Sequence, residues 1–263
     1  MLYARALLLR NCGRFTHVSS DFGSQYHTHT FVTSEALYAS LTREATWRHA
    51  SKFVDLEEDA KKLTGGNYFF CDYDVKAKPL WFTPGMFVDE RFHLLTKQRG
   101  VVDKNDFNVV DEGYPGTGGG GRAYYCPTYG RIESVLPDHR LLTCALSPKL
   151  SELESFTVRQ TFIMGKKRTM FQLVNVSAVT ELVELREDVY IHEECQPIQV
   201  QLNQVSHFRE YEILAGTARY LLLRGKTSEA SLAASFAYTN EATTIRRILP
   251  AFWVEQVRQR LSV

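Results

Sequence analysis

The most informative run of residues for the fold lies near the start of the chain and reads Leu2-Tyr3-Ala4-Arg5-Ala6-Leu7-Leu8-Leu9-Arg10. In an extended strand, successive side chains point to opposite faces. One face here carries Tyr3, Arg5, Leu7 and Leu9, and the other carries Leu2, Ala4, Ala6 and Leu8. Both faces are largely apolar, which is typical of a strand covered on both sides. We therefore predict a central strand over residues 2–10.

The later half of the chain carries further strand patterns. Apolar and polar residues alternate over 156–163, and a second strand pattern follows over 169–176. The short connection Met164-Gly165-Lys166-Lys167-Arg168 between them indicates a basic hairpin tip. Two more strands are predicted at 197–205 and 217–224.

Helix patterns are interspersed with these strands. Ser34 is expected to cap a helix over 34–41, Asp55 a second over 55–64, and an aromatic strand follows over 67–75. Residues 241–261 are expected to be helical, with Pro250 kinking that helix or starting another. Its apolar stripe indicates core packing and consists of Ile245, Leu249, Phe252 and Trp253. Mixed elements without strict strand–helix alternation predict an α+β fold around an antiparallel sheet.

Composition narrows the class of protein. The chain has 263 residues, 44% of them hydrophobic and 23% charged, which excludes a disordered or collagen-like protein. Its five cysteines are scattered without a CxxC pair, so reduced thiols in a cytoplasmic protein are expected. Arginines interrupt the first apolar run, and no stretch of about 18 apolar residues occurs, so we expect no signal peptide and no membrane partner.

We expect one domain over residues 1–263 with an insertion at about 96–122. This insertion contains the run Gly116-Thr117-Gly118-Gly119-Gly120-Gly121. The run lacks the GxxxxGK[ST] order of a phosphate-binding loop, so it indicates a flexible excursion rather than a nucleotide site.

Motifs for catalysis or metal binding are weak. His27 and His29 are separated by one residue and would share a face in a strand, with His17 or Asp21 as a third metal ligand. The alternative is that they are polar loop histidines. The chain has no HExxH or GxSxG motif, and Cys12 or Cys144 would meet a histidine only through the fold. We therefore expect no cofactor and no metal. A metal-free endoribonuclease site stays open because it leaves no fixed spacing.

Nucleic-acid binding unites more of the features. The net charge is only +1, yet Lys166, Lys167 and Arg168 are consecutive cations at a predicted tip that begins with Gly165. Clustered cations are suited to phosphates. Arg159 and Arg14 would extend this surface, while Phe15 and Tyr26 would stack on unpaired bases. The alternative is a merely solvated hairpin tip.

Several of these stretches, in order, resemble the Cas-five family of CRISPR effector complexes, most closely its type I-D branch. The resemblance includes the first strand, the aromatic loop from Gly13-Arg14-Phe15 to Phe31, and the helix start Ser34-Glu35-Ala36-Leu37-Tyr38-Ala39. It also includes the strand, tip and strand from Thr161 to Phe171, with Gly165-Lys166-Lys167-Arg168 at the turn. The resemblance is patchy between residues 2 and 176.

The resemblance implies a RAMP-superfamily protein with an RRM-like, ferredoxin-like core and long insertions. It further implies a non-catalytic subunit of a type I surveillance (Cascade) complex, acting in antiviral defence and DNA interference. Such a subunit holds the 5′ handle of the guide RNA (crRNA) and helps recognise PAM-side target DNA, beside a large subunit and backbone subunits. By motif, Gly165, Lys166, Lys167 and Arg168 would contact RNA, with Arg14 and Phe15 as weaker candidates. The competing functions are an endoribonuclease of the same superfamily, a metalloenzyme using His27 and His29, and a pure protein scaffold.

Overall fold

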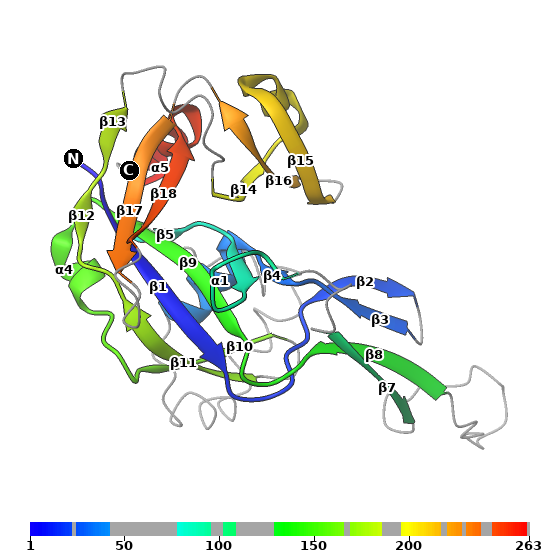
Figure 1. The fold of residues 1–263 in the computed structure, drawn as a ribbon. Coiled ribbons are helices and arrows are strands. Elements are labelled where there is room, and N and C mark those ends of the chain that lie inside the picture. Colours follow the sequence, from blue (N-terminus) through cyan, green and yellow to red (C-terminus); the bar gives the residue numbers. More distant parts are fainter. Residues whose placement is uncertain are drawn as a thin grey trace, which may run out of the picture.

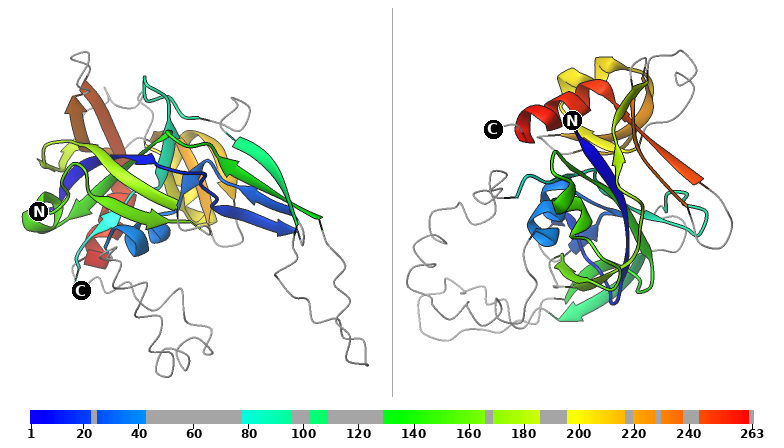
Figure 2. Two further views of the ribbon diagram at one scale, coloured as in Figure 1. Left: turned by 90° about the horizontal axis from the view of Figure 1, so that it is seen from below. Right: turned by 90° about the vertical axis from the view of Figure 1, so that its left-hand side faces the viewer.

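The computed structural model describes ten segments of the chain, namely residues 1–22, 25–42, 78–95, 102–108, 129–165, 169–185, 196–216, 220–227, 230–237 and 244–261. The predicted helix at 55–64 and strand at 67–75 lie outside these residues, as does the glycine run at 116–121. Figures 1 and 2 show the arrangement of the described elements.

The first strand is central, as its two apolar faces predict. β1 (Tyr3–Asn11) lies between two antiparallel neighbours, β9 (Arg140–Ser147) and β11 (Thr169–Val176). The strand order across the main sheet is β10-β11-β1-β9-β6-β4, and two short strands make it eight-stranded by pairing with β1 and β9. The other strands of this sheet are β10 (Thr161–Met164), β6 (Gly85–Val88), β4 (Phe31–Val32), β12 (Thr180–Glu181) and β5 (Trp81–Phe82).

Three smaller sheets surround the main one (Figure 1). The first is a three-stranded sheet of β13 (Val183–Leu185), β17 (Ala230–Ala237) and β18 (Thr244–Pro250). The second consists of β14 (Ile198–Val200), β16 (Leu221–Thr227) and β15 (Phe208–Gly216). The third consists of β2 (Val18–Phe22), β3 (Gln25–Thr28), β8 (Tyr129–Val135) and β7 (Val102–Asn108). In this third sheet β3 and β8 run parallel.

The prediction of an α+β, ferredoxin-like core is wrong. The protein is mostly β, and its main sheet is a curled antiparallel half-barrel. Among the described residues the helices are short: α1 (Ser34–Leu41), α4 (Leu150–Glu154), the 3-10 helix η4 (Leu202–His207) and α5 (Ala251–Leu261). A ferredoxin-like core needs helices long enough to cover one face of the sheet. Here α1 and α4, which contact strands of the main sheet, have only eight and five residues.

The largest local disagreement lies near the C-terminus. The sequence pattern predicts a helix over residues 244–250, but they form β18, which pairs antiparallel with β17 from Ala237↔Thr244 to Ala230↔Pro250. Helix propensity is a weak signal that a partner strand overrides. Pro250 ends the strand and α5 begins at the next residue, so the predicted role of Pro250 at a helix start is confirmed. Leu249 and Trp253 are buried, as the stripe indicates.

Other elements agree in part. The helix at 34–41 is confirmed, although Thr33 rather than Ser34 caps it, accepting a hydrogen bond from the Ala36 amide at 3.2 Å. The strand expected at 156–163 begins only at Thr161, whereas the strand at 169–176 is confirmed. The strand expected at 197–205 ends at Val200, and a 3-10 helix follows. Within the expected insertion at 96–122, residues 102–108 form β7 against β8.

The two faces of the main sheet carry different neighbours. Directly paired residues share a face, so Arg5, Ala145 and Phe82 lie on one face, with Leu9, Leu141 and Phe87. We call this the α4 face, because Arg5 binds carbonyls of α4 and the turn after it. The opposite face carries Ala6, Cys144, Leu8, Leu142 and Met86, and a cavity lies against it. We call this the cavity face.

Within the described residues, no helix has both the length and the apolar character to cross a membrane.

Candidate functional site

The predicted basic tip connects two described strand ends. Met164 of β10 pairs with Thr169 of β11, so residues 165–168 form the whole connection between the two strands. Lys166, Lys167 and Arg168 lie outside the described residues, whereas Gly165 and Thr169 at either end lie within them. The three predicted cations stand in the sequence between these two described residues.

Gly165 is required at its position by backbone geometry. Its φ is +79°, in the left-handed region that residues with a Cβ rarely adopt. A Cβ built there would lie 2.6 Å from Cε2 of Phe15 and 2.7 Å from the carbonyl oxygen of Thr16. The turn thus packs directly on the loop that follows β1. A larger residue would push the turn away from that loop.

Two further contacts fasten this loop to the hairpin. The Thr169 hydroxyl donates to the carbonyl of Arg14 at 2.6 Å, and the Cys12 amide donates to the carbonyl of Met170 at 2.8 Å. The exposed Arg14 is therefore brought next to the turn, although the two are about 150 residues apart in sequence. We call residues 14 and 165–169 the hairpin-tip site.

The prediction that Phe15 stacks on a base is wrong. Its side chain is 0% exposed and packs edge-on against Phe171 at a ring-centroid distance of 5.0 Å. Phe87 at 5.8 Å and the parallel ring of His17 at 6.2 Å complete the cluster. Phe15 thus supports the turn from beneath. The side chain of Tyr26, the other stacking candidate, lies outside the described residues.

Arg159 does not join the hairpin-tip site. It lies before β10, at the opposite end of that strand from Gly165, and its amide donates to the carbonyl of Leu173 at 2.8 Å. Its φ of +79° places it at a tight turn, and its side chain is exposed. At about 3.4 Å per residue, the length of β10 separates it from the turn by more than 10 Å.

The outward surface beside the turn includes residues that sequence reasoning missed. Ile163 and Met170 pair across β10 and β11, and each is 48% exposed. Their neighbours Phe162 and Phe171 point inward and are buried. The period-2 alternation in Thr161–Met164 could have predicted the exposure of Ile163. In a strand, burial of Phe162 and Met164 places Ile163 on the opposite, outward face.

The histidine pair gains no metal-site geometry from the described residues. Among them, no group of three or more His, Cys, Asp or Glu side chains is placed to hold a metal ion. The His29 ring packs on Phe31 at 4.2 Å, and the His27 side chain lies outside the described residues. Burial lowers the pKa of His17 to about 4, so this ring is neutral at physiological pH. Burial likewise raises the pKa of Cys144 to about 12, which leaves its thiol a poor nucleophile.

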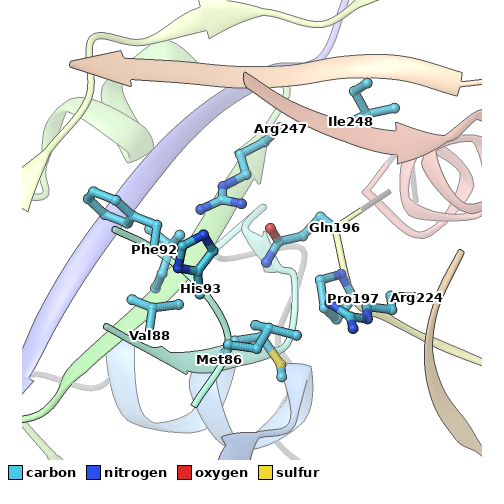
Figure 3. Close-up of a pocket in the computed structure, with 11 residues that line it drawn as sticks. Met86, Val88, Phe92, His93, Gln196, Pro197, Arg224, Arg247 and Ile248 are labelled. Atoms are coloured by element: carbon cyan, nitrogen blue, oxygen red, sulfur yellow. The ribbon is translucent and has the colours of Figure 1, made fainter. Parts of the chain in front are cut away.

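A second polar cluster, which no sequence pattern indicated, lines a cavity of about 270 Å³ (Figure 3). Arg247 and Gln196 point into it from β18 and from the residue pair before β14. Apolar walls come from β6 and β9 of the cavity face, and His93 and Arg224 also line the cavity. Sequence reasoning missed this site because Arg247 lies in a segment that was predicted to be helical. An arginine in such a segment is expected on the face exposed to solvent.

Comparisons with known proteins assign no family to the chain. No family model matches it, and no curated protein matches it. Function must therefore be argued from the two polar sites and the residues that position them.

Proposed function

We propose that this protein is a non-catalytic RNA-binding protein that holds single-stranded RNA at its hairpin-tip site. The observation that carries the proposal is the fixed base of the β10–β11 turn, where Gly165 and Thr169 are locked onto the loop from Arg14 to Thr16. Anchoring of the residues on either side of Lys166, Lys167 and Arg168 in the sequence lowers the entropic cost of binding RNA with these cations, compared with a free tail.

The composition of this surface fits a single strand of RNA. Consecutive cations neutralise successive phosphates, and the affinity then falls steeply with salt. Arg14 adds a fourth cationic side chain at the base of the turn. The exposed Ile163 and Met170 offer apolar contact to unpaired bases in place of the aromatic stacking expected from Phe15.

A finer form of the proposal rests on the resemblance to the Cas-five family. In that form the RNA is the 5′ handle of a CRISPR guide, in a cytoplasmic type I surveillance complex with a large subunit, backbone subunits and PAM-side target DNA. The α1 helix, which contains the resembling segment Ser34 to Ala39, lies between Arg14 and the β10–β11 turn in the chain. The ferredoxin-like core that the resemblance implied has no part in this proposal.

The primary test measures RNA affinity at several salt concentrations. The triple variant K166A/K167A/R168A should bind a short single-stranded RNA more weakly, and its log–log salt slope should be shallower by about 2, or roughly 0.7 for each phosphate that is no longer neutralised. A matched control removes three cations elsewhere: Lys149 before α4, Arg209 of β15 and Arg258 of α5. An equal loss of RNA affinity in both variants would mean that net charge alone, and not the hairpin-tip site, explains the binding. No loss in either would favour a protein scaffold.

A second experiment addresses the finer form. The protein would be purified together with the products of its neighbouring genes, and the co-eluting RNA would be sequenced. A uniform short RNA with one constant 5′ end, lost in the triple variant, is the expected result. Cleavage of a supplied precursor by the isolated protein would instead favour the endoribonuclease alternative.

A further inference from the structure

The cavity face holds a cation, Arg247, whose hydrogen-bonding capacity is partly unused among the described residues. The Nε and Nη2 atoms of Arg247 are buried and have no hydrogen-bond partner within the described part of the chain. The arginine fork presents parallel donors suited to oxyanions. Burial lowers the pKa of Arg247 to about 10, so the group remains charged at neutral pH. Such an unpaired buried charge is costly, and natural structures rarely keep one without a use.

Among the residues that the structure describes, no neighbouring group supplies a negative charge to offset it. Cys144 lies close enough to interact with Arg247, but burial raises the pKa of its thiol to about 12 and keeps it neutral. The nearby carboxylates are already engaged, since Asp89 binds His93 at 3.2 Å and Glu212 binds Arg224 at 2.7 Å. None of the residues that line the cavity is acidic.

Gln196 provides the second unused group. Its side-chain Oε1 is buried and also lacks a hydrogen-bond partner in the described structure. Its backbone amide donates to the carbonyl of Ile248 at 2.8 Å, which holds it beside the residue that follows Arg247. Figure 3 shows the carboxamide and the guanidinium directed toward the same space. The cavity therefore combines a donor fork with one acceptor.

The unpartnered atoms are enclosed by protein. Nε and Nη2 of Arg247 and Oε1 of Gln196 therefore have no hydrogen bond to a described residue to lose when a ligand engages them. The walls that flank them are apolar and include Met86, Val88 and Leu142. In such a setting a charge-assisted hydrogen bond is stronger than it is in water.

We propose that this cavity binds the phosphate group of a phosphomonoester, with Arg247 donating to two phosphate oxygens and Gln196 Oε1 accepting from the protonated P–OH. A phosphate offers two acceptors and one donor on a single small group, whereas an ionised carboxylate has no donor for Gln196. Arg224, a second cation, also lines the cavity, where it is paired with Glu212. This site does not depend on the proposed RNA function, because it involves none of the hairpin-tip residues.

The test is a calorimetric titration of the whole protein with inorganic phosphate. Saturable binding is expected, weakened at least about tenfold in Arg247→Met, which keeps the chain length but removes the donors. Arg258→Met removes a partly exposed cation on α5 and should bind phosphate as the unmodified protein does. Equal binding by Arg247→Met would overturn the proposal. Acetate binding as tightly as phosphate would overturn the choice of phosphate.

A second variant keeps the test decisive if Arg247→Met fails to fold. Gln196→Glu places a carboxylate beside Arg247, so it should raise the thermal midpoint and abolish phosphate binding together. Retained phosphate binding in a folded Gln196→Glu protein would contradict the proposal.

Competition identifies the source of the phosphate. Ribose 5-phosphate displacing inorganic phosphate indicates a small phosphomonoester. Displacement only by a 5′-phosphorylated oligoribonucleotide, and not by its 5′-hydroxyl form, indicates an RNA end. Displacement by neither would reject a phosphomonoester ligand.

Discussion

Each face of the main sheet has a partly buried arginine beside it, and the two arginines differ in how many hydrogen bonds they make. On the α4 face, Arg5 donates from Nε to the carbonyl of Ser177 at 2.8 Å, and from Nη1 to the carbonyls of Leu153 and Phe156 at 2.8 and 3.0 Å. On the cavity face, Arg247 leaves Nε and Nη2 without a partner among the described residues. Desolvation lowers the pKa of both groups.

The difference separates a structural cation from a binding one. Arg5 ties β1 to α4 and to the segments that flank it, and its satisfied donors have nothing left for a ligand. Arg247 carries the same fork, but no described acceptor uses it fully. The α4 face is also where Phe15 packs, and that cluster supports the hairpin-tip site. One face therefore provides rigidity, and the other keeps unsatisfied polar groups.

The largest effect on stability is expected from Phe15→Ala, which tests whether the α4 face is tightly packed. Phe15 is fully buried against Phe87 and Phe171, so its truncation should cost about 3–5 kcal/mol of the free energy of unfolding. Urea denaturation measures this loss. The control Tyr211→Ala, at a ring that is 49% exposed, should cost much less. A similar small loss for both would show that the α4 face is not the tightly packed one.

Arg5→Met should have the next largest effect. It removes three hydrogen bonds from a cation and leaves three carbonyls without that donor, so we expect a loss of about 2–3 kcal/mol. Arg10→Met is the matched control on the same strand, where the side chain is exposed and the expected change is within about 0.5 kcal/mol. Thermal and urea unfolding of the two variants would give the difference. Indistinguishable stabilities would remove the structural role assigned to Arg5.

Gly165→Ala tests the link between the α4 face and the RNA site. Positive φ and the close approach to Phe15 and Thr16 predict a loss of about 1–3 kcal/mol of stability. RNA affinity should fall as well, because the turn is displaced from Arg14. At Gly13 a Cβ would meet only Thr169 Cγ2, at an ordinary 3.7 Å, so Gly13→Ala should be nearly neutral. Full RNA affinity in Gly165→Ala would show that RNA binding does not depend on the geometry of the turn.

The pH dependence of stability probes the same cluster more gently. The folded pKa of His17 is about 4, below its ordinary value of 6.5, so the unfolded chain binds the extra proton first. The contribution of neutral His17 is complete above pH 6.5 and is lost as the pH falls toward 4. Denaturation midpoints across this window should decline less in His17→Leu than in the unmodified protein. Parallel profiles would place the acid sensitivity elsewhere.

The smallest effect is expected on the cavity face. Without phosphate, Arg247→Met should be neutral or slightly stabilising, by up to about 1 kcal/mol, because an unpaired charge is replaced by an apolar chain. The same substitution at Arg5 is expected to be strongly destabilising, so measuring both variants tests the difference between the two arginines directly. A loss at Arg247 as large as that at Arg5 would mean that Arg247 is structural too.

Much of the strand framework was predictable from local pattern. β1 and β11 follow from apolar runs and alternation, and α1 from its cap and helix formers. The hairpin tip with its glycine was also predictable, because a short glycine-led basic connection between two alternating runs is a local signal. Burial of Phe15 was not predictable, since an aromatic residue in a polar loop can face either solvent or core.

The sequence by itself determined which strand is central, where one helix begins and where the basic tip lies, because these depend on side chains close together in the chain. Only the tertiary structure decided that residues 244–250 are a strand, that Phe15 supports the turn, and that Arg247 and Gln196 share a cavity. Each of these depends on partners far apart in sequence. Burial and hydrogen-bond satisfaction belong to the assembled fold, so no local pattern records them.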